Sequence, residues 1–486
     1  MSTSRPPTPP SRLPRSDEGR FPSVGPACEW SESYYPGNLH PIDVGDILGD
    51  GERYKVLRKL GYGAFSTVWL ARDLSKEDGG AENRFVALKV VIAKAGRSAD
   101  LPEVKLYKHL ASVSQRADLD RHVTKLLDTF DISGPNGTHA CLVFEPMGPT
   151  VSSMVGQLPQ FVRRPLFVKA RYPLWMAKQI VRGALEALSF VHHHGVAHGD
   201  VQPGNFLFNL KINLDSVPEA ELLHPGNQPP PKSGLTTSKP LERLDGKVDP
   251  WAPRRLYVPQ PLADWANYGR GFSVKLSDLG GAYPLNNPPP KIVTPTGLRA
   301  PELVLKSSTD ILDGRALDIW SLGCLVFEFV TGESLFLLPW MPGQTDEEED
   351  DEHLMQMVLR LGPLRAADWA RWTRSSHYFR ADKEGQRTLF NMRVGESEDE
   401  SEDEGEGEDD DDIMRPEDMH PWALQTMEEK LVRLAPMDMT NAQARQVQQL
   451  IRRMLQYDPK ERPTAEELLQ DPWFQDGHEG RKRRKG

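Results

Sequence analysis

The chain has 486 residues, of which 38% are hydrophobic and 27% are charged, so it can bury a sizeable core and still carry tails and insertions. Its three cysteines, Cys28, Cys141 and Cys324, lie far apart without a CxxC spacing, so the sequence suggests neither a disulfide framework nor a zinc site. The net charge of −11 comes from residues 396–412, which hold 13 acidic groups and no basic one. Direct nucleic-acid binding is not favoured, because the one basic cluster is the short segment 481–485.

Membrane and export signals are missing from the sequence pattern. No apolar run approaches the roughly 18 residues of a membrane span, and residues 1–16 lack the apolar core of a signal peptide. We therefore expect a protein that does not contact membranes and that resides in the cytoplasm, the nucleus or both. We also expect it to be a monomer. Residues 1–30 are rich in Ser, Pro and Arg, which predicts a disordered N-terminal tail.

Short apolar runs begin near Tyr54 and are separated by turns that contain Gly and Asp. They predict strands of one antiparallel sheet at residues 54–57, 67–70, 85–91 and 140–144. After about residue 150 the apolar spacing becomes helical, and a first helix ends at Gly195. Later helices are predicted over residues 317–330, 353–361 and 441–455.

This change of period predicts an α+β chain with two lobes. The folded domain is expected over residues 54–474, with an antiparallel-sheet small lobe at about 54–147 and a mainly helical large lobe at about 148–474. A Pro-rich insert at 212–265, the acidic insert at 396–412 and a basic tail at 475–486 are expected to lie outside the core.

Two features of the predicted sheet are suited to binding phosphate. Gly61 and Gly63 lie between two strands, where a hairpin of small residues could bring backbone amides to an anion; plain turn chemistry is the alternative. Lys89 interrupts an apolar strand, where an ammonium group needs either solvent or an anion. It is either a snorkelling lysine or a lysine that holds phosphates and pairs with a helix glutamate. Glu103, at the start of the next helical stretch, is the candidate partner.

The polar string His-Gly-Asp-Val-Gln-Pro-Gly-Asn occupies residues 198–205, directly after the first predicted helix. Phosphoryl transfer needs an acidic group beside the attacking hydroxyl and ligands for a divalent cation. Asp200 would orient that hydroxyl or accept its proton, and Asn205 would bind Mg²⁺. Asp278, in Lys-Leu-Ser-Asp-Leu-Gly, would supply the second magnesium ligand.

Three later motifs follow in the order found in protein kinases. They are Ala-Pro-Glu ending at Glu302, Asp-Ile-Trp-Ser-Leu-Gly starting at Asp318, and Arg462 in Lys-Glu-Arg-Pro-Thr. In that architecture Glu302 and Arg462 form a buried ion pair, and Asp318 braces the loop that carries Asp200. The ordered motifs predict a bilobal protein-kinase fold that uses ATP and Mg²⁺.

With these motifs in place, residues 34–475 resemble the SR-protein kinases, which phosphorylate serines in arginine/serine-rich splicing factors. The resemblance rests on the strings at 35–46 and 60–70, on Val-Phe-Glu at 143–145 and on Asp-Leu-Gly at 278–280. It implies basic protein substrates, and acids at 346–352 that dock arginine-rich chains. It also implies a nucleotide site formed by Leu60, Gly61, Gly63, Ser66, Val68, Ala87, Lys89, Phe144, Glu145, Met147 and Leu207.

The chain departs from the usual kinase pattern at three places. Gly199 replaces an arginine that in many kinases reads a phosphorylated activation loop, and SR-protein kinases also lack that arginine. Gln202 replaces the lysine that contacts the transferring phosphate. Loss of this cation should weaken transition-state stabilisation by about 2–4 kcal/mol, the scale measured for other single electrostatic contacts. Near Pro295, where the family has a threonine that bonds the catalytic loop, Thr294 and Thr296 flank the position instead.

These departures leave two alternatives open. The loop at 198–205 is also similar to that of aminoglycoside and choline phosphotransferases, although Glu302 and Arg462 argue against a small-molecule kinase. A catalytically weak pseudokinase that acts as a scaffold is the other alternative. The presence of Lys89 and Asp200, together with both magnesium ligands, argues against it.

Overall fold

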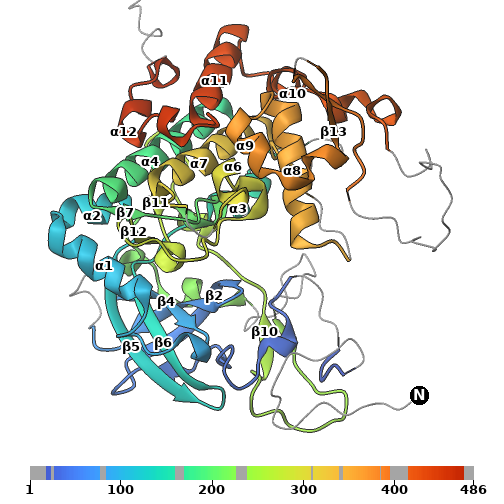
Figure 1. Ribbon diagram of the computed structural model, residues 1–486. Helices are drawn as coiled ribbons and strands as arrows, with labels where there is room; N and C mark the ends of the chain where they lie inside the picture. The colour runs from blue at the N-terminus through green and yellow to red at the C-terminus, as the bar shows by residue number, and fades with distance from the viewer. Residues whose placement is uncertain are drawn as a thin grey trace, which may run out of the picture. The chain divides into compact units, whose positions relative to one another are not determined.

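The computed structural model describes residues 18–22, 27–76, 84–158, 169–225, 238–307, 310–338, 343–383, 385–394 and 414–475. The chain divides into two compact units, the first from Met1–Val151 and Leu207–Gly280, the second from Ser152–Phe206 and Gly281–Gly486. Strands dominate the first unit and helices dominate the second (Figure 1), so the predicted α+β class is confirmed. Residues 207–280 belong to the first unit, although the sequence predicts them in the large lobe.

A six-stranded antiparallel sheet with the order β1-β2-β3-β4-β6-β5 forms the framework of the first unit. Nearly every side chain of β4 is buried, which explains its continuous apolar run where a half-exposed strand would alternate. The strands are β1 (Ile47–Leu48), β2 (Tyr54–Gly63), β3 (Ser66–Asp73), β4 (Phe85–Val91), β5 (Leu126–Gly134) and β6 (Gly137–Phe144). Short strands form two further pairs in this unit, β9 (Ser238–Pro240) with β10 (Arg255–Tyr257), and β8 (Phe206–Phe208) with β11 (Val274–Leu276).

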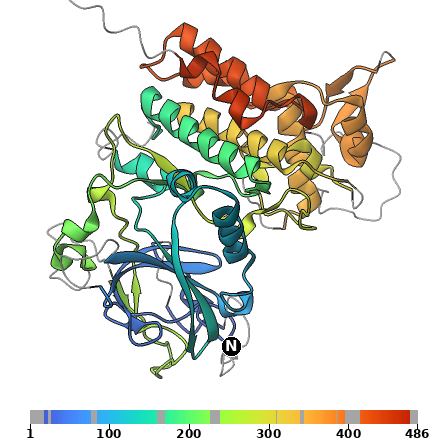
Figure 2. The ribbon, with the colours of Figure 1, turned by 90° about the vertical axis from the view of Figure 1, so that its left-hand side faces the viewer.

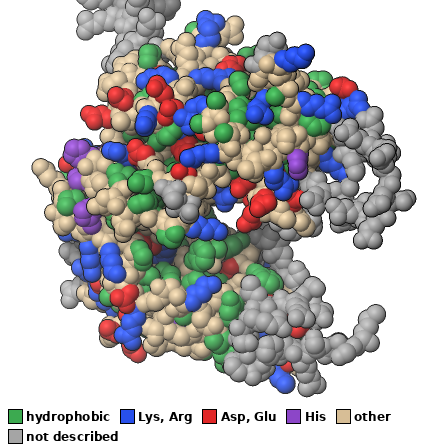
Figure 3. Space-filling model, viewed as in Figure 1, with side chains coloured by type: hydrophobic (Ala, Val, Ile, Leu, Met, Phe, Trp, Pro, Cys, Tyr) green, Lys and Arg blue, Asp and Glu red, His purple; other side chains and the backbone are tan. Residues whose placement is uncertain are grey.

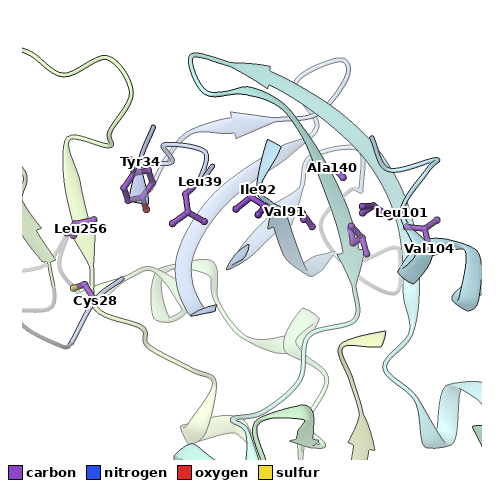
Figure 4. Close-up of a cluster of buried hydrophobic side chains, with 10 residues drawn as sticks. Cys28, Tyr34, Leu39, Val91, Ile92, Leu101, Val104, Ala140 and Leu256 are labelled. Atoms are coloured by element: carbon purple, nitrogen blue, oxygen red, sulfur yellow. The ribbon is translucent and has the colours of Figure 1, made fainter. Parts of the chain in front are cut away.

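Helix α1 (Pro102–Val113) packs on the sheet through a shared hydrophobic core. Pro102 at the first helical position is favourable because its missing N–H would have no partner there, and Glu103 in the first turn suits the positive end of the helix dipole. Figure 4 shows Leu101 and Val104 in the same cluster as Val91 and Ile92 at the end of β4. This packing fixes the start of α1 beside the strand that carries Lys89. The other α-helices in the described part of this unit are α2 (Arg116–His122) and α5 (Glu219–Leu222).

The N-terminal residues pack into the first unit earlier than the sequence predicts. The prediction of a disordered tail over residues 1–30 is wrong for the described part, because Arg20, Phe21, Cys28 and Glu29 are buried. Arg20 donates to Glu32 at 2.8 Å. Residues 1–17 lie outside the described residues. Ion pairs and a few large apolar groups hold a segment whose composition favours disorder.

The insert at 212–265 also contributes to the core, which corrects the prediction that it lies outside. Leu214, Val217, Leu222 and Leu262 are buried against the strands in one cluster, and Leu256 lies in the cluster of Figure 4. The buried guanidinium of a β2 arginine, Arg58, donates to the carbonyls of residues 221–223 at 2.9–3.0 Å. A Pro-rich stretch can therefore be part of a core when its few apolar residues are buried among those of the strands.

Helices α4 and α11 pack on α7 in the second unit (Figure 2). All but two residues of α7 are buried, so its apolar run has little periodicity. A Cβ on Gly323 of α7 would lie 2.9 Å from Cβ of Met454, which is why glycine is needed at this crossing. The helices are α3 (Val151–Met154), α4 (Leu174–His193), α6 (Pro301–Val304), α7 (Gly314–Thr331), α8 (Asp346–Leu361), α9 (Ala366–Arg371), α10 (Met427–Leu434), α11 (Asn441–Met454) and α12 (Ala465–Leu468). Strand β7 (Val196–Ala197) pairs with β12 (Tyr283–Pro284), and β13 (Phe379–Ala381) pairs with β14 (Arg387–Leu389).

The predicted ion pair between Glu302 and Arg462 is present in the second unit. The guanidinium donates to the two carboxylate oxygens at 2.6 and 2.7 Å and to the Ala316 carbonyl at 2.9 Å. The Arg462 side chain is 0% exposed. A bidentate pair with this burial joins segments 160 residues apart and fixes α6 against α7.

The acidic stretch at 346–352 forms the first turns of α8. Thr345 and Glu348 make a capping box, and acids in the first turn suit the helix dipole. Asp351 points inward and accepts from Trp372 at 2.6 Å and from Tyr378 at 3.0 Å. The acidic insert at 396–412 and residues 476–486 of the basic tail lie outside the described residues. Within the described chain, no helix is long and apolar enough to cross a membrane.

His353 of α8 is expected to make the fold sensitive to acid. It is fully buried beside Phe336, and burial, reinforced by Arg299, lowers its pKa from 6.5 to about 3. Because the unfolded chain takes up this proton below pH 6.5 and the folded chain does not, stability is lost as the pH falls toward 3. His353 should contribute a slope of about 1.4 kcal/mol per pH unit in that window.

Urea unfolding of the wild type and of His353→Leu at pH 4.5–7.5 measures this contribution. Below pH 6.5 the unfolding free energy of the variant should fall less steeply than that of the wild type, by about 1.4 kcal/mol per pH unit. This difference corresponds to one proton. Some slope will remain, because His40 and His224 have pKa values lowered to about 3 and about 4, mainly by burial. Equal slopes for the two proteins would contradict the assignment.

Candidate active site

The glycine-rich hairpin, residues 61–68, joins β2 to β3 in the first unit. Gly63 pairs with Ser66, so the turn is the dipeptide Ala64-Phe65, and Phe65 is exposed. A Cβ on Gly61 or Gly63 would meet no atom within 4 Å, and neither residue has a positive φ. These glycines are therefore required neither by packing nor by backbone conformation, and open space remains where a side chain would begin. That space fits the predicted approach to a phosphate.

Lys89 lies on β4 between Val68 of β3 and Leu142 of β6. Its Nζ is 2.9 Å from both carboxylate oxygens of Glu103 and 2.8 Å from Oδ1 of Asp278. Burial lowers the pKa of this ammonium, but the two carboxylates outweigh burial and raise the pKa above its ordinary value. Because the side chain is only 13% exposed, the snorkelling interpretation does not hold. Lys89 is a fixed cation held between two acids.

Asp278 follows β11 and adopts an unusual backbone conformation. Its φ is +59°, in the left-handed region that few residues other than glycine occupy. The Gly280 N–H donates to Oδ1 at 3.2 Å, and the following Leu279 is buried. The side chain of Asp278 is nevertheless 47% exposed. Strained backbone of this kind occurs at functional sites, where it aims a side chain.

The other predicted nucleotide residues of the first unit lie along the same strands. Ala87 pairs with Phe144, whose ring packs against Tyr107 at 5.5 Å. The Glu145 carboxylate accepts from Lys275 Nζ at 2.6 Å and from the Lys125 N–H at 2.8 Å, so its side chain holds the segment after β6 in place. The remaining positions are Leu60, partly buried; Ser66 and Val68 in β3; Met147, buried after β6; and Leu207, bridged to Thr150.

Sequence reasoning missed Tyr107 and Lys275. Tyr107 lies on the same face of α1 as Glu103, one turn later, and its hydroxyl hydrogen-bonds Thr124 at 3.0 Å. Lys275 lies in the motif that contains Asp278. Its charge in a short apolar strand could have indicated a functional residue.

The catalytic loop, residues 198–205, is braced in the second unit by Asp318 of α7. The carboxylate of Asp318 accepts from the backbone N–H of His198 at 2.7 Å and of Gly199 at 2.8 Å. It also bonds Nε2 of His192, at the end of α4, at 2.9 Å. Asp318 is 1% exposed, so these charge-assisted bonds hold the loop in one conformation.

Asp200 is surrounded by amide donors from its own loop. Nε2 of Gln202 lies 2.9 and 2.8 Å from its two carboxylate oxygens. Nδ2 of Asn205 donates to the Asp200 carbonyl at 2.8 Å and to Oδ2 at 2.9 Å. Asp200 is therefore a carboxylate held in a fixed orientation, as positioning of an attacking hydroxyl requires. Gln202 contributes to this orientation without adding a charge.

The structure accounts for two of the departures from the kinase pattern. Gly199 has a φ of +71°, and a Cβ there would lie 2.7 Å from the Gly281 carbonyl oxygen. A side chain at this position is excluded by both strain and space. Thr294 donates its hydroxyl to the Gly199 carbonyl at 2.7 Å, so it makes the bond to the catalytic loop that the sequence left in doubt between Thr294 and Thr296.

The predicted magnesium ligands offer oxygen donors, as a hard cation requires. The partly exposed carboxylate of Asp278 is one. Because Asn205 uses its NH₂ group on Asp200, its amide oxygen is the atom it could offer. The residues that the structure describes contain no group of three or more His, Cys, Asp or Glu that could hold a metal ion.

Comparison with known proteins agrees with these motifs. The protein kinase domain family matches residues 54–215 and 265–474. Serine/threonine-protein kinase SRPK of Physarum polycephalum is 28% identical over 461 residues, covering 92% of this chain and 91% of that protein. Protein kinase dsk1 of Schizosaccharomyces pombe is 27% identical over 404 residues, 68% of this chain and 69% of its own. SRSF protein kinase 3 of Sus scrofa is 33% identical over 249 residues, 49% of this chain and 40% of its own.

The matched ranges contain the Lys89 pair, the catalytic loop and the Glu302–Arg462 ion pair. The gap in the family match, residues 216–264, falls within the insert that packs on the first unit. The chain therefore belongs to the protein kinase domain family, in which it is a divergent SR-protein kinase and hence a serine/threonine protein kinase.

Proposed function

We propose that this kinase transfers the γ-phosphate of ATP to serine hydroxyls of basic, arginine/serine-rich proteins such as splicing factors, in the cytoplasm or the nucleus. The observation that carries the ATP part is the Lys89 cation fixed between Glu103 and Asp278. The substrate class is supported by the names of the relatives, among them SRSF protein kinase 3.

Each candidate residue has a role that its geometry supports. Lys89 would bind phosphate oxygens, and Glu103 would keep its ammonium in place. Asp200 would orient the attacking hydroxyl and take up its proton, because its carboxylate is already aligned by two amides. Asn205 and Asp278 would hold Mg²⁺, which when bound neutralises charge on the phosphates.

The acidic face of α8 supports a cationic substrate. Figure 3 shows acidic side chains gathered on this helix, and Asp346 and Glu347 in its first turn are exposed. Burial raises the pKa of Asp350 to about 6, a rise that its neighbouring acids reinforce and that Arg299, 3.7 Å away, opposes. Bringing an arginine to this face would relieve repulsion among the acids and would steer basic chains toward it.

The test is phosphate transfer from ATP with Mg²⁺ to a peptide of arginine/serine repeats, compared with an aminoglycoside and choline. We expect labelling of the peptide alone, and its loss in Lys89→Met, which removes the phosphate-binding cation and keeps the side-chain volume. Labelling of a small molecule and no peptide would support the phosphotransferase alternative. ATP binding with no transfer above the Lys89→Met background would support the scaffold.

Gln202→Lys is expected to raise kcat. The variant restores a cation where many kinases contact the transferring phosphate, and one such electrostatic contact changes kcat by on the order of tenfold or more. Initial rates at saturating ATP and peptide measure the change. Gln202→Met is the matched control, because it keeps the volume, adds no charge and loses both bonds to Asp200, so its kcat should fall. No gain with lysine would mean that another cation already serves the phosphate.

A further inference from the structure

Lys59 is a buried ammonium two residues before the first glycine of the glycine-rich hairpin. It is 0% exposed on β2, and the pairing of β2 with β3 is irregular between Lys59 and Gly61. Burial lowers the pKa of Lys59. A charge in this position is tolerated only if an anion meets it, because an unpaired buried ammonium costs several kcal/mol.

The anion is Glu29, from a segment before the sheet begins. Its Oε1 accepts from Lys59 Nζ and from the Tyr34 hydroxyl, the latter at 2.5 Å. Cys28 and Tyr34, on either side of Glu29, are buried with Leu256 of the insert in the cluster of Figure 4. Glu29 is therefore anchored by packing and by a second hydrogen bond, so it can hold Lys59 in one place.

Lys59 contacts the glycine-rich hairpin, so its fixed position restrains the hairpin as well. Its Nζ lies 5.6 Å from the ring centroid of Tyr62, which stands between Gly61 and Gly63, and 5.2 Å from that of Trp69 in β3. Its carbonyl accepts from the Gln260 N–H at 2.8 Å. The cation under Tyr62 is thus fixed at its side chain by the N-terminal residues and at its backbone by the insert.

We propose that Glu29 is a positioning residue for nucleotide binding, acting through the Lys59 ammonium on Tyr62 and hence on the glycine-rich hairpin. The inference rests on the proposed function, since that hairpin is the proposed phosphate site. Two glycines give the hairpin more backbone freedom than other residues would, so binding a nucleotide there costs ordering entropy. A cation–π contact at Tyr62 lowers that cost by holding the hairpin beforehand.

The experiment compares steady-state kinetics of Glu29→Gln, Lys59→Met and Glu32→Gln with the wild type. Glu29→Gln is expected to raise KM for ATP by roughly 5- to 20-fold, the scale of a lost cation–π contact, with a smaller effect on kcat. Lys59→Met should raise KM similarly, and it should lower the free energy of unfolding, because it leaves the Glu29 carboxylate buried without its counterion. Glu32→Gln is the matched control, since Glu32 is equally buried in the same segment but binds Arg20. It should leave KM within about twofold of wild type.

Two results would overturn the assignment. One is a KM for ATP within twofold of wild type in both Glu29→Gln and Lys59→Met, and the other is an equal rise in Glu32→Gln. If the wild type transfers no phosphate, the proposed function fails, and the dissociation constant of a fluorescent ATP analogue replaces KM as the measure. An unchanged dissociation constant in Glu29→Gln and Lys59→Met would then defeat the positioning role separately.

Discussion

Asp200→Ala is expected to abolish most phosphate transfer, lowering kcat by roughly 10²- to 10⁴-fold, the range that a positioned general base contributes. Asp200 is the carboxylate that Gln202 and Asn205 align and that the brace from Asp318 holds in place. Alanine removes both the acceptor for the hydroxyl proton and the group that orients the hydroxyl. Initial rates with an arginine/serine-repeat peptide at saturating ATP measure the loss.

Nucleotide affinity provides the control for this variant. Lys89 and its two acids all belong to the first unit, whereas Asp200 belongs to the second, so ATP binding should persist. A variant that binds ATP and transfers phosphate at more than a tenth of the wild-type rate would show that another group serves as base. Loss of ATP binding together with transfer would instead point to misfolding.

Glu302→Gln is expected to lower the free energy of unfolding by about 3–5 kcal/mol, because Arg462 would remain as a buried charge without its counterion. The guanidinium is 0% exposed and makes both of its shortest bonds to Glu302. Replacing both residues, as in Glu302→Gln with Arg462→Met, should recover much of the loss, since the unpaired charge is removed as well. Urea unfolding of the three proteins measures both effects.

An exposed ion pair gives the matched control. Arg182 and Glu186 form an i,i+4 pair on α4, and both side chains are more than 40% exposed. Glu186→Gln should cost about 0.5 kcal/mol or less, because solvent screens exposed pairs. A Glu302→Gln cost as small as the Glu186→Gln cost would show that the buried pair contributes little to the fold.

The sequence by itself determined the elements whose apolar spacing is regular. The strand predicted at 85–91 has the bounds of β4, and the helix predicted at 441–455 differs from α11 by one residue. The order of the motifs around Lys89, Asp200 and Asp278 was sufficient to predict the fold and the chemistry expected of it. β5 was missed, because its burial is intermediate along nearly its whole length and it carries no clear alternation.

Only the tertiary structure decided which distant groups meet. Lys89 and Asp278 form an ion pair although they are 189 residues apart in the sequence, and Thr294 donates to Gly199 although 95 residues separate them. The N-terminal residues and the insert have compositions typical of disorder, yet they supply Glu29, Arg20 and Leu256 to the first unit. The physical reason is that local spacing fixes which face of an element is apolar. The partner of a buried charge depends on which segments the chain brings together, and no local pattern records that.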